Sequence, residues 1–305
     1  LYDRIFYFTL RTQNYTSHKM KKVAIQGGLG AYHEIAARNY FADEDVTILP
    51  CLTFRDIFEE AQKDPSLIGV MAIENTIAGG LLPNHDLLKL NDLWIVGEHK
   101  LRISHCLAAL PGQKLEDIKE VTSHPMALMQ CDDFLDGMPW VKVVEHEDTA
   151  LAAKDISQKS LHGVAAICSS YAAELYNLEV LSVGIETNKR NFTRFLILAH
   201  KHMLPELQKN KKINKSSLVF VLPHSEGSLS GVLSVLSFYN INLTRIQSLP
   251  ILGREWEYQF YIDLTFTDYN RYKQSIDAIM PLVANLKILG EYSKGKNLDI
   301  ENNNI

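Results

Sequence analysis

The stretch RNFTRFLILAH, residues 190–200, joins a polar mouth to an apolar run. Residues 195–199 carry no polar side chain, which is typical of a strand buried inside a sheet. Asn191, Thr193 and Arg194 precede this run and bring an amide, a hydroxyl and a guanidinium to its start. The stretch therefore predicts a core strand with chemically useful groups at its mouth.

Short apolar runs alternate with helical stretches upstream of this strand. From Val23 the chain reads VAIQGG, HEIAARNYFA, DVTILPC, FRDIFEEAQ and IGVMAIE, of which the second and fourth are helical. A second set begins with ISHCLAAL at residue 103 and ends with FTRFLILA. Such alternation favours parallel sheet with helices on its faces. The sequence thus predicts two α/β lobes with a cleft between them.

Length and composition limit the class of protein. A chain of 305 residues exceeds the usual size of a single core, so two or three compact units are expected. A formal net charge of −5 gives no field that would gather nucleic acid or anionic lipid. The apolar runs are of strand length, too short to cross a membrane. The four cysteines lie far apart with no Cys-x-x-Cys pair, which fits reduced cytoplasmic thiols better than a disulfide scaffold or a zinc site.

Changes in composition divide the chain into segments. The expected segments are an unstructured leader (1–19), a two-lobed part (20–200), a Lys- and Asn-rich linker (201–215), a C-terminal unit (216–295) and a tail (296–305). The apolar pattern of the C-terminal unit predicts the order β-α-β-β-α-β. Its segment YQFYIDLTF alternates apolar and polar residues as a strand does. Pro281 is expected to kink the last helix. Such a unit leaves one face of its sheet bare, which favours pairing with another copy.

Two further strand ends carry polar side chains. The residues are Glu74, Asn75 and Thr76 after one strand, and Ser123, His124 and Gln130 around the end of another. Ligands bind at such ends in open α/β sheets, although each group could instead cap a helix or a turn. No Ser/His/Asp order, carboxylate pair or metal-spaced ligand set emerges. Hydroxyls, amides and one arginine suit a site that holds an anion and protonates a weak leaving group.

The loop GGLGAYH, residues 27–33, lies between a strand and a helix. A dinucleotide fingerprint would need Gly or Ala where His33 stands, so that interpretation is disfavoured. Two alternatives remain: a tight turn, or a loop whose backbone N–H groups take a carboxylate.

Five motifs carry a resemblance that covers residues 22–295. They are AIENTIAGG, TSHPMALMQC, EDTALAA, AAICSSYAAELYNL and NFTRFLIL. In their order and spacing the chain resembles prephenate dehydratase, and its C-terminal unit resembles the attached ACT regulatory domain. The resemblance implies a catalytic domain over residues 20–200 with a two-lobed fold like that of type 2 periplasmic-binding proteins. It also implies a ferredoxin-like ACT domain.

The resemblance implies a reaction and its partners as well. Prephenate loses carbon dioxide and hydroxide to give phenylpyruvate in L-phenylalanine biosynthesis, a step that makes the ring aromatic and needs neither cofactor nor metal. L-phenylalanine is the expected allosteric effector, in a homodimer formed through ACT domains or in a tetramer. No chorismate-mutase segment precedes Met20 in this sequence, so the monofunctional form is expected.

Site residues follow from the same motifs. Thr193 is the expected hydroxyl donor to the leaving oxygen, and Asn75 and Gln130 are the amides expected to orient the substrate. Further substrate contacts are expected from Glu74, Thr76, Ser123, His124 and Arg194. Arg194 could pair with a substrate carboxylate or brace its strand against Glu74. The first loop departs from the family pattern, because Ala31 and His33 stand where the family has Thr and Ser.

The expected effector site lies in the C-terminal unit. Its residues are Gly227, Ser228, Leu229, Asn242, Leu243, Gln247 and Ser248. The family writes Glu-Ser-Arg-Pro where this chain has Gln247 and Leu249 around Ser248. Joint loss of both charges predicts that L-phenylalanine binds more weakly here than in relatives that keep them.

Two alternatives remain open. Arogenate dehydratase uses the same scaffold on a substrate with an amino group in place of the keto group. A non-catalytic amino-acid sensor would have the same outline. A sensor has no use for a donor aimed at a leaving group, so the set Thr193, Asn75 and Gln130 favours an enzyme.

Overall fold

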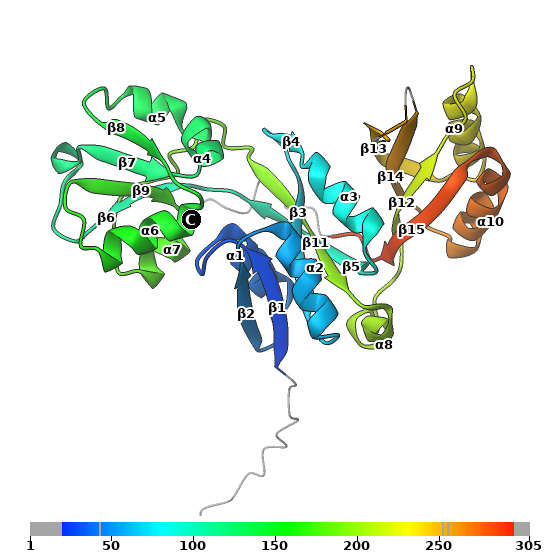
Figure 1. The fold of residues 1–305 in the computed structure, drawn as a ribbon, viewed down its shortest axis with the longest axis horizontal. Coiled ribbons are helices and arrows are strands. Elements are labelled where there is room, and N and C mark those ends of the chain that lie inside the picture. The colour runs from blue at the N-terminus through cyan, green and yellow to red at the C-terminus, as the bar shows by residue number, and fades with distance from the viewer. Residues whose placement is uncertain (1–19, 43, 252, 255–256, 296–305) are drawn as a thin grey trace, which may run out of the picture.

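Three units follow one another across the molecule in the computed structural model (Figure 1). The structure describes residues 20–42, 44–251, 253–254 and 257–295. Lobe 1 lies in the centre, lobe 2 lies on one side of it, and the C-terminal unit lies on the other (Figure 1). The predicted leader and tail fall outside the described residues.

Lobe 1 is built on five strands in the order β5-β11-β3-β1-β2. Their bounds are Lys21–Gln26 (β1), Val46–Cys51 (β2), Ile68–Asn75 (β3), Trp94–Arg102 (β5) and Phe192–Ala199 (β11). Strands β1, β2 and β3 are parallel, but β11 is antiparallel to both β3 and β5. The predicted parallel sheet is therefore confirmed for β1, β2 and β3 but not for β5 and β11. The chain leaves lobe 1 through β5 and returns through β11, so the returning strand runs the other way.

Helices cover both faces of this sheet. Helix α1 (Tyr32–Tyr40) packs on one face, while α2 (Phe54–Lys63) and α3 (Leu82–Leu90) pack on the other. A two-residue strand, β4 (Gly79–Gly80), pairs with the end of β3. Strand β5 and helix α3 were not predicted from the sequence.

Lobe 2 is a five-stranded sheet in the order β10-β6-β9-β7-β8. Its strands are β6 (Cys106–Ala109), β7 (Glu120–Ser123), β8 (Lys142–Glu145), β9 (Val164–Cys168) and β10 (Glu179–Val183). Its helices are α4 (Pro125–Gln130), α5 (Asp132–Asp136), α6 (Thr149–Gln158) and α7 (Ser170–Leu175). Helices α6 and α7 cover one face and α4 covers the other. The two α/β lobes predicted from the sequence are therefore confirmed.

The C-terminal unit follows the predicted β-α-β-β-α-β order. Its elements are β12 (Lys215–Val221), α9 (Ser228–Phe238), β13 (Asn242–Pro250), β14 (Tyr258–Thr265), α10 (Tyr269–Ile279) and β15 (Ala284–Tyr292). The strand order β13-β14-β12-β15 and two helices on one face make it ferredoxin-like. Between β11 and β12 lie a 3₁₀ turn (Lys201–Met203) and the short helix α8 (Leu204–Leu207).

The second face of the C-terminal sheet is covered by lobe 1. Leu249, Tyr261 and Leu289 are buried in one cluster with residues of β3, β11 and α3. Strand β15 also pairs with β5 at Gly290 and Ile95, so the two sheets are continuous. A Cβ on Gly290 would lie 2.4 Å from Ile95, so only glycine permits this approach. The face that was expected to be bare is therefore an intramolecular interface.

Pro281 ends the last helix instead of kinking it. Helix α10 stops at Ile279, and a 3₁₀ turn spans Met280–Leu282. Proline has no N–H for the helical ladder and clashes with the carbonyl four residues earlier, so the helix does not continue. Among the described residues, none of the helices combines the length and the apolar character needed to cross a bilayer.

Candidate active site

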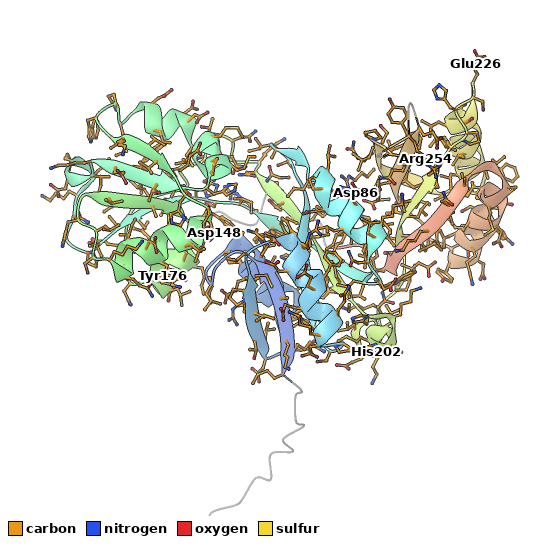
Figure 2. All side chains as sticks on the ribbon, in the orientation of Figure 1. Asp86, Asp148, Tyr176, His202, Glu226 and Arg254 are labelled. Carbon is orange, nitrogen blue, oxygen red and sulfur yellow. The ribbon has the colours of Figure 1, made fainter. Side chains whose placement is uncertain are left out.

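A cavity of about 250 Å³ lies between the two lobes. Lobe 1 contributes Asn75, Thr193 and Phe195, and lobe 2 contributes Gln130 and Asp148. Asp148 lies where lobe 2 meets lobe 1 (Figure 2). We call this space the inter-lobe cavity. It brings together the three residues predicted to be catalytic.

Asn75 and Thr193 form a directional hydrogen bond at the edge of lobe 1. They are directly opposite on β3 and β11, and Asn75 Nδ2 donates to Thr193 Oγ1 at 2.9 Å. The amide of Asn75 cannot be reversed, because its Oδ1 accepts from the backbone N–H groups of Ile77 and Ala78, both at 2.9 Å. Thr193 is thus an acceptor toward Asn75, and its own O–H proton remains available to the cavity.

A second amide chain runs from Asn75 to lobe 2. Asn75 Nδ2 also donates to Asn191 Oδ1 at 2.7 Å, and Asn191 Nδ2 donates to Gln130 Oε1 at 2.8 Å. His105 Nε2 lies 3.0 Å from the same oxygen. Because an amide oxygen only accepts, His105 carries its proton on Nε2. Both lone pairs of Gln130 Oε1 are then used, and the amide N–H groups of Gln130 remain for a ligand.

Tyr32, the first residue of α1, is the last member of this series of hydrogen bonds. Its hydroxyl lies 2.9 Å from His105 Nδ1 and 2.7 Å from the carbonyl oxygen of Ser104. Burial lowers the pKa of His105, which favours the neutral ring. A continuous hydrogen-bonded chain thus links Tyr32 of lobe 1, through lobe 2, to Thr193 of lobe 1.

Three members of this chain were not among the predicted site residues. Asn191 stands two positions before Thr193 in the polar mouth, which was a usable signal. His105 is a lone histidine before an apolar strand, and Tyr32 is an aromatic residue at the start of a helix. Neither pattern distinguishes a functional side chain from an ordinary buried one.

Three other predicted residues have local structural partners. The Ser123 hydroxyl is fully buried and donates to the Ile167 carbonyl at 2.6 Å. Thr76 joins the end of β3 to the start of β11, since its hydroxyl donates to the Arg190 carbonyl at 2.8 Å. His124 borders the inter-lobe cavity, but its ring also caps α4 by accepting from the Met126 N–H at 3.1 Å.

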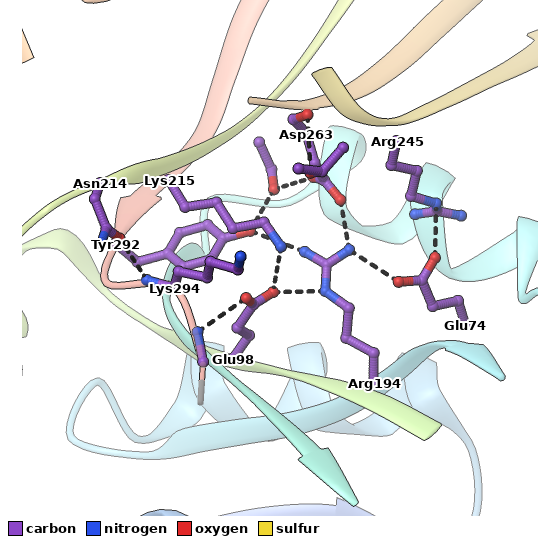
Figure 3. A network of polar contacts seen from close by, with 12 residues as sticks. Glu74, Glu98, Arg194, Asn214, Lys215, Arg245, Asp263, Tyr292 and Lys294 are labelled. Atoms are coloured by element: carbon purple, nitrogen blue, oxygen red, sulfur yellow. Dashed lines mark hydrogen bonds and ion pairs between the residues drawn. The ribbon is translucent and has the colours of Figure 1, made fainter. Parts of the chain in front are cut away.

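Arg194 lies on the opposite face of β11 from Thr193, because side chains alternate along a strand. It contacts Glu98 Oε2 at 2.6 Å, Glu74 Oε1 at 3.3 Å and the Tyr292 hydroxyl at 3.0 Å, and it pairs with Asp263 (Figure 3). Neither Arg194 nor Glu74 borders the inter-lobe cavity. Of the two interpretations of Arg194, the geometry supports bracing of the strand, and substrate contacts by Arg194 and Glu74 in this cavity are not supported.

One backbone donor of the first loop binds a carboxylate of the same chain. The Gly30 N–H binds the carboxylate of Glu34 at 2.7 Å, so the carboxylate met by this loop belongs to the chain itself. His33 accepts from the Ala72 N–H at 3.3 Å through Nε2, and its ring lies edge-on to Phe195. Burial lowers the pKa of His33 to about 3, which keeps the ring neutral with its proton on Nδ1.

The predicted effector residues lie on two separate surfaces of the single chain. Gly227 is the N-cap of α9, and Ser228 and Leu229 begin the helix beside an exposed hollow. Asn242 and Leu243 begin β13. Farther along the same strand are Gln247, beside a different hollow next to lobe 1, and Ser248. Leu249 is buried against lobe 1, so apolar packing occupies the place of the expected charge.

Fold and site together define a two-lobed α/β protein with a cavity between its lobes that is lined by hydrogen-bonding side chains. No lysine or arginine borders the inter-lobe cavity among the described residues. Neutral amide, hydroxyl and imidazole donors dominate instead. Such donors assist the departure of an oxygen and do not create a strong nucleophile.

Comparison with known proteins identifies the family. Residues 23–203 match the family model described as prephenate dehydratase, and the chain belongs to this family of carbon–oxygen lyases. Arogenate dehydratase/prephenate dehydratase 2, chloroplastic, from Arabidopsis thaliana is 34% identical over 291 residues, which are 92% of this chain and 75% of that protein.

Two solved structures are similar over most of the chain. One is prephenate dehydratase from Arthrobacter aurescens in complex with L-Phe, which is 28% identical with a TM-score of 0.78 and covers 89% of each chain. The other is GqqA, described as a novel type of quorum quenching acylase, which is 30% identical with a TM-score of 0.79. It covers 90% of this chain and 98% of its own.

Proposed function

We propose that the chain converts prephenate to phenylpyruvate in L-phenylalanine biosynthesis, with Thr193 as the proton donor to the leaving oxygen. The observation that supports this role most directly is the 2.9 Å hydrogen bond in which Thr193 accepts from Asn75. An acceptor with a free proton, held in place by an oriented amide, is what a departing hydroxyl requires.

The proposed reaction balances in atoms and charge with Thr193 and one proton from solvent. Breaking the bond between the carboxylate carbon and the ring releases carbon dioxide, and its electron pair moves into the ring. The ring then expels the hydroxyl, which takes a proton from Thr193 and leaves as water. Thr193 regains a proton from solvent, so the net reaction consumes one proton and yields phenylpyruvate, carbon dioxide and water. Gln130 Nε2 supplies a donor from lobe 2 that would hold the substrate across the cavity.

The arogenate alternative differs at one group of the substrate. Arogenate carries an ammonium where prephenate has a keto oxygen, and the name of the Arabidopsis relative includes both activities. Parallel assays of phenylpyruvate from prephenate and of L-phenylalanine from arogenate test the proposal. Turnover of prephenate at the higher kcat/KM supports it, and turnover of arogenate alone overturns it.

We further propose that the C-terminal unit is an ACT regulatory domain over residues 216–295, joined by a linker (201–215) to the catalytic domain (20–200). The exposed face of α9 offers a hollow lined by Ser228, Leu229 and Ser234. A second copy placed on this face would form a homodimer, or a tetramer by further pairing, and L-phenylalanine would bind between the paired units. The proposed assembly is tested by measuring the mass of the protein in solution with and without L-phenylalanine, and a monomer under both conditions overturns it.

We also propose a cytoplasmic location.

A further inference from the structure

Two cross-strand pairs of opposite charge face each other between lobe 1 and the C-terminal unit. Glu74 and Arg194 are register partners on β3 and β11, and Arg245 and Asp263 are register partners on β13 and β14. Arg245 Nε lies 3.1 Å from Glu74 Oε2, and Arg194 Nη1 pairs with Asp263 Oδ2 (Figure 3). We call these four residues the charge cluster. Each pair of strands thus presents one cation and one anion to the other.

Arg194 and Asp263 of the charge cluster are buried and reinforced by their neighbours, whereas the side chains of Glu74 and Arg245 are 36% and 14% exposed. Arg194 and Asp263 are each 5% exposed. Ser217 donates to Asp263, and Glu98 binds both Arg194 and Lys215. Burial alone would raise the pKa of Asp263, but the Arg194 and Lys215 cations hold it at about 2, so the carboxylate is ionised. Removing Asp263 would leave the buried Arg194 with only Glu98 and Glu74 as carboxylate partners, and removing Arg245 would leave Glu74 with Arg194 alone. Either change alters the balance of charges that holds the Arg194 guanidinium in place.

Gly80 makes room for the contact between the two units. It pairs with Glu74 on the short strand β4, and a Cβ at this position would lie 2.9 Å from Arg245 Nη2. A larger residue would therefore require the guanidinium end of Arg245 to shift.

The catalytic pair lies one register step from the charge cluster. Glu74 precedes Asn75 on β3, and Arg194 follows Thr193 on β11. We infer that Arg245 and Asp263 of the C-terminal unit are positioning residues for the Asn75–Thr193 pair, acting through Glu74 and Arg194. The inference rests on the proposed role of Thr193. On this inference the C-terminal unit helps to fix the geometry of the active site, acting from the face of the lobe 1 sheet that is opposite to Thr193.

The test compares variants of the charge cluster with a matched control. Arg245→Met and Asp263→Asn each remove one charge that reaches lobe 1, and Arg245→Lys keeps the charge. Asp86→Ala is the control, because Asp86 on α3 also binds the C-terminal unit, accepting from Gln259 at 2.9 Å and Tyr261 at 3.2 Å (Figure 2). Asp86 does not contact the charge cluster among the described residues. Kinetics with prephenate are measured on the full chain, well below each melting temperature.

The inference predicts a loss of kcat that the control does not share. Arg245→Met and Asp263→Asn should lower kcat by about 10- to 100-fold with little change in KM, as expected when reacting groups are misplaced. Arg245→Lys should recover most of this loss, and Asp86→Ala should keep the parent kcat even where its melting temperature falls as far. If Arg245→Met does not fold, Asp263→Asn decides, because it preserves the shape of the side chain.

Two outcomes separate this inference from the proposed function. Parent-like kcat in Arg245→Met and Asp263→Asn, beside an impaired Thr193→Ala variant, overturns the inference alone. An equal loss in Asp86→Ala also overturns it, since the effect would then be general loosening of the interface. An unimpaired Thr193→Ala variant overturns the catalytic proposal, and the inference with it.

Discussion

Asn75 and Thr193 face each other across β3 and β11, and the amide of Asn75 donates to the hydroxyl of Thr193 at 2.9 Å. Two backbone N–H groups fix the direction of this bond by occupying the oxygen of Asn75. The order of donors and acceptors therefore leaves the Thr193 proton for the inter-lobe cavity.

Reversing that order should slow catalysis without changing the shape of the site. Asn75→Asp replaces the donating NH₂ by an acceptor, so Thr193 would donate to the new carboxylate instead of to the leaving group. We expect a loss in kcat/KM at least as large as that of Asn75→Ala, which should be about 1–3 kcal/mol for an unsatisfied partner. Steady-state kinetics of both variants check this. Near-parent activity in Asn75→Asp would show that the polarity of the bond is irrelevant.

His105 should act by holding the amide of Gln130 in one orientation. His105→Phe removes the N–H that meets Gln130 Oε1, whereas His105→Gln can supply one from a similar place. We expect about a tenfold loss of kcat/KM in the Phe variant, about 1–1.5 kcal/mol for one hydrogen bond, and substantial recovery in the Gln variant. Equal losses in both variants, tracking their melting temperatures, would assign His105 to packing alone.

Acid should destabilise the fold from about neutral pH downward. The unfolded His33 binds a proton near pH 6.5, while burial lowers its folded pKa to about 3. Between these values the unfolded chain binds more protons, so stability is complete above about pH 6.5 and is lost as the pH falls toward 3. His33→Gln should flatten the dependence of the free energy of unfolding on pH, measured by urea titration between pH 7 and about 4. An unchanged slope would contradict the pKa assignment.

L-phenylalanine should bind, but more weakly than where the charged Glu-Ser-Arg-Pro motif is kept. Loss of about 1–2 kcal/mol of charge-assisted hydrogen bonding predicts roughly tenfold weaker binding, in the millimolar range. Calorimetry with L-phenylalanine, and with D-phenylalanine as the control, measures this. Micromolar affinity in the parent chain would contradict the role assigned to Gln247. A Leu249→Arg substitution would not be a clean way to restore the charged motif, because Leu249 is buried against lobe 1.

Sequence periodicity was sufficient for most strands and for the polar strand ends. Strands β3 and β11 and the C-terminal order were predicted because their apolar runs are long or alternate cleanly. The sequence did not predict strand β5, because His99, Lys100 and Arg102 interrupt the apolar pattern in its second half. The direction of β11 depends on where the chain re-enters lobe 1, which local sequence does not encode.

The roles of the polar groups depended on contacts between distant residues. Arg194 meets Asp263 and Tyr292, which are 69 and 98 residues away in the chain. No local pattern predicts how the C-terminal sheet packs against lobe 1, so bracing and substrate binding could not be separated beforehand. The contacts of His105 and Asn191 with Gln130 likewise depend on how lobe 2 packs beside lobe 1.

The most direct test of the account is the rate of phenylpyruvate formation from prephenate by the parent chain, Thr193→Ala and Thr193→Ser. Loss of a positioned proton donor predicts a kcat lower by about 10²- to 10⁴-fold in Thr193→Ala, a smaller change in KM, and much higher activity in Thr193→Ser, which keeps the hydroxyl. A folded Thr193→Ala variant that turns over prephenate within a few-fold of the parent would contradict the account.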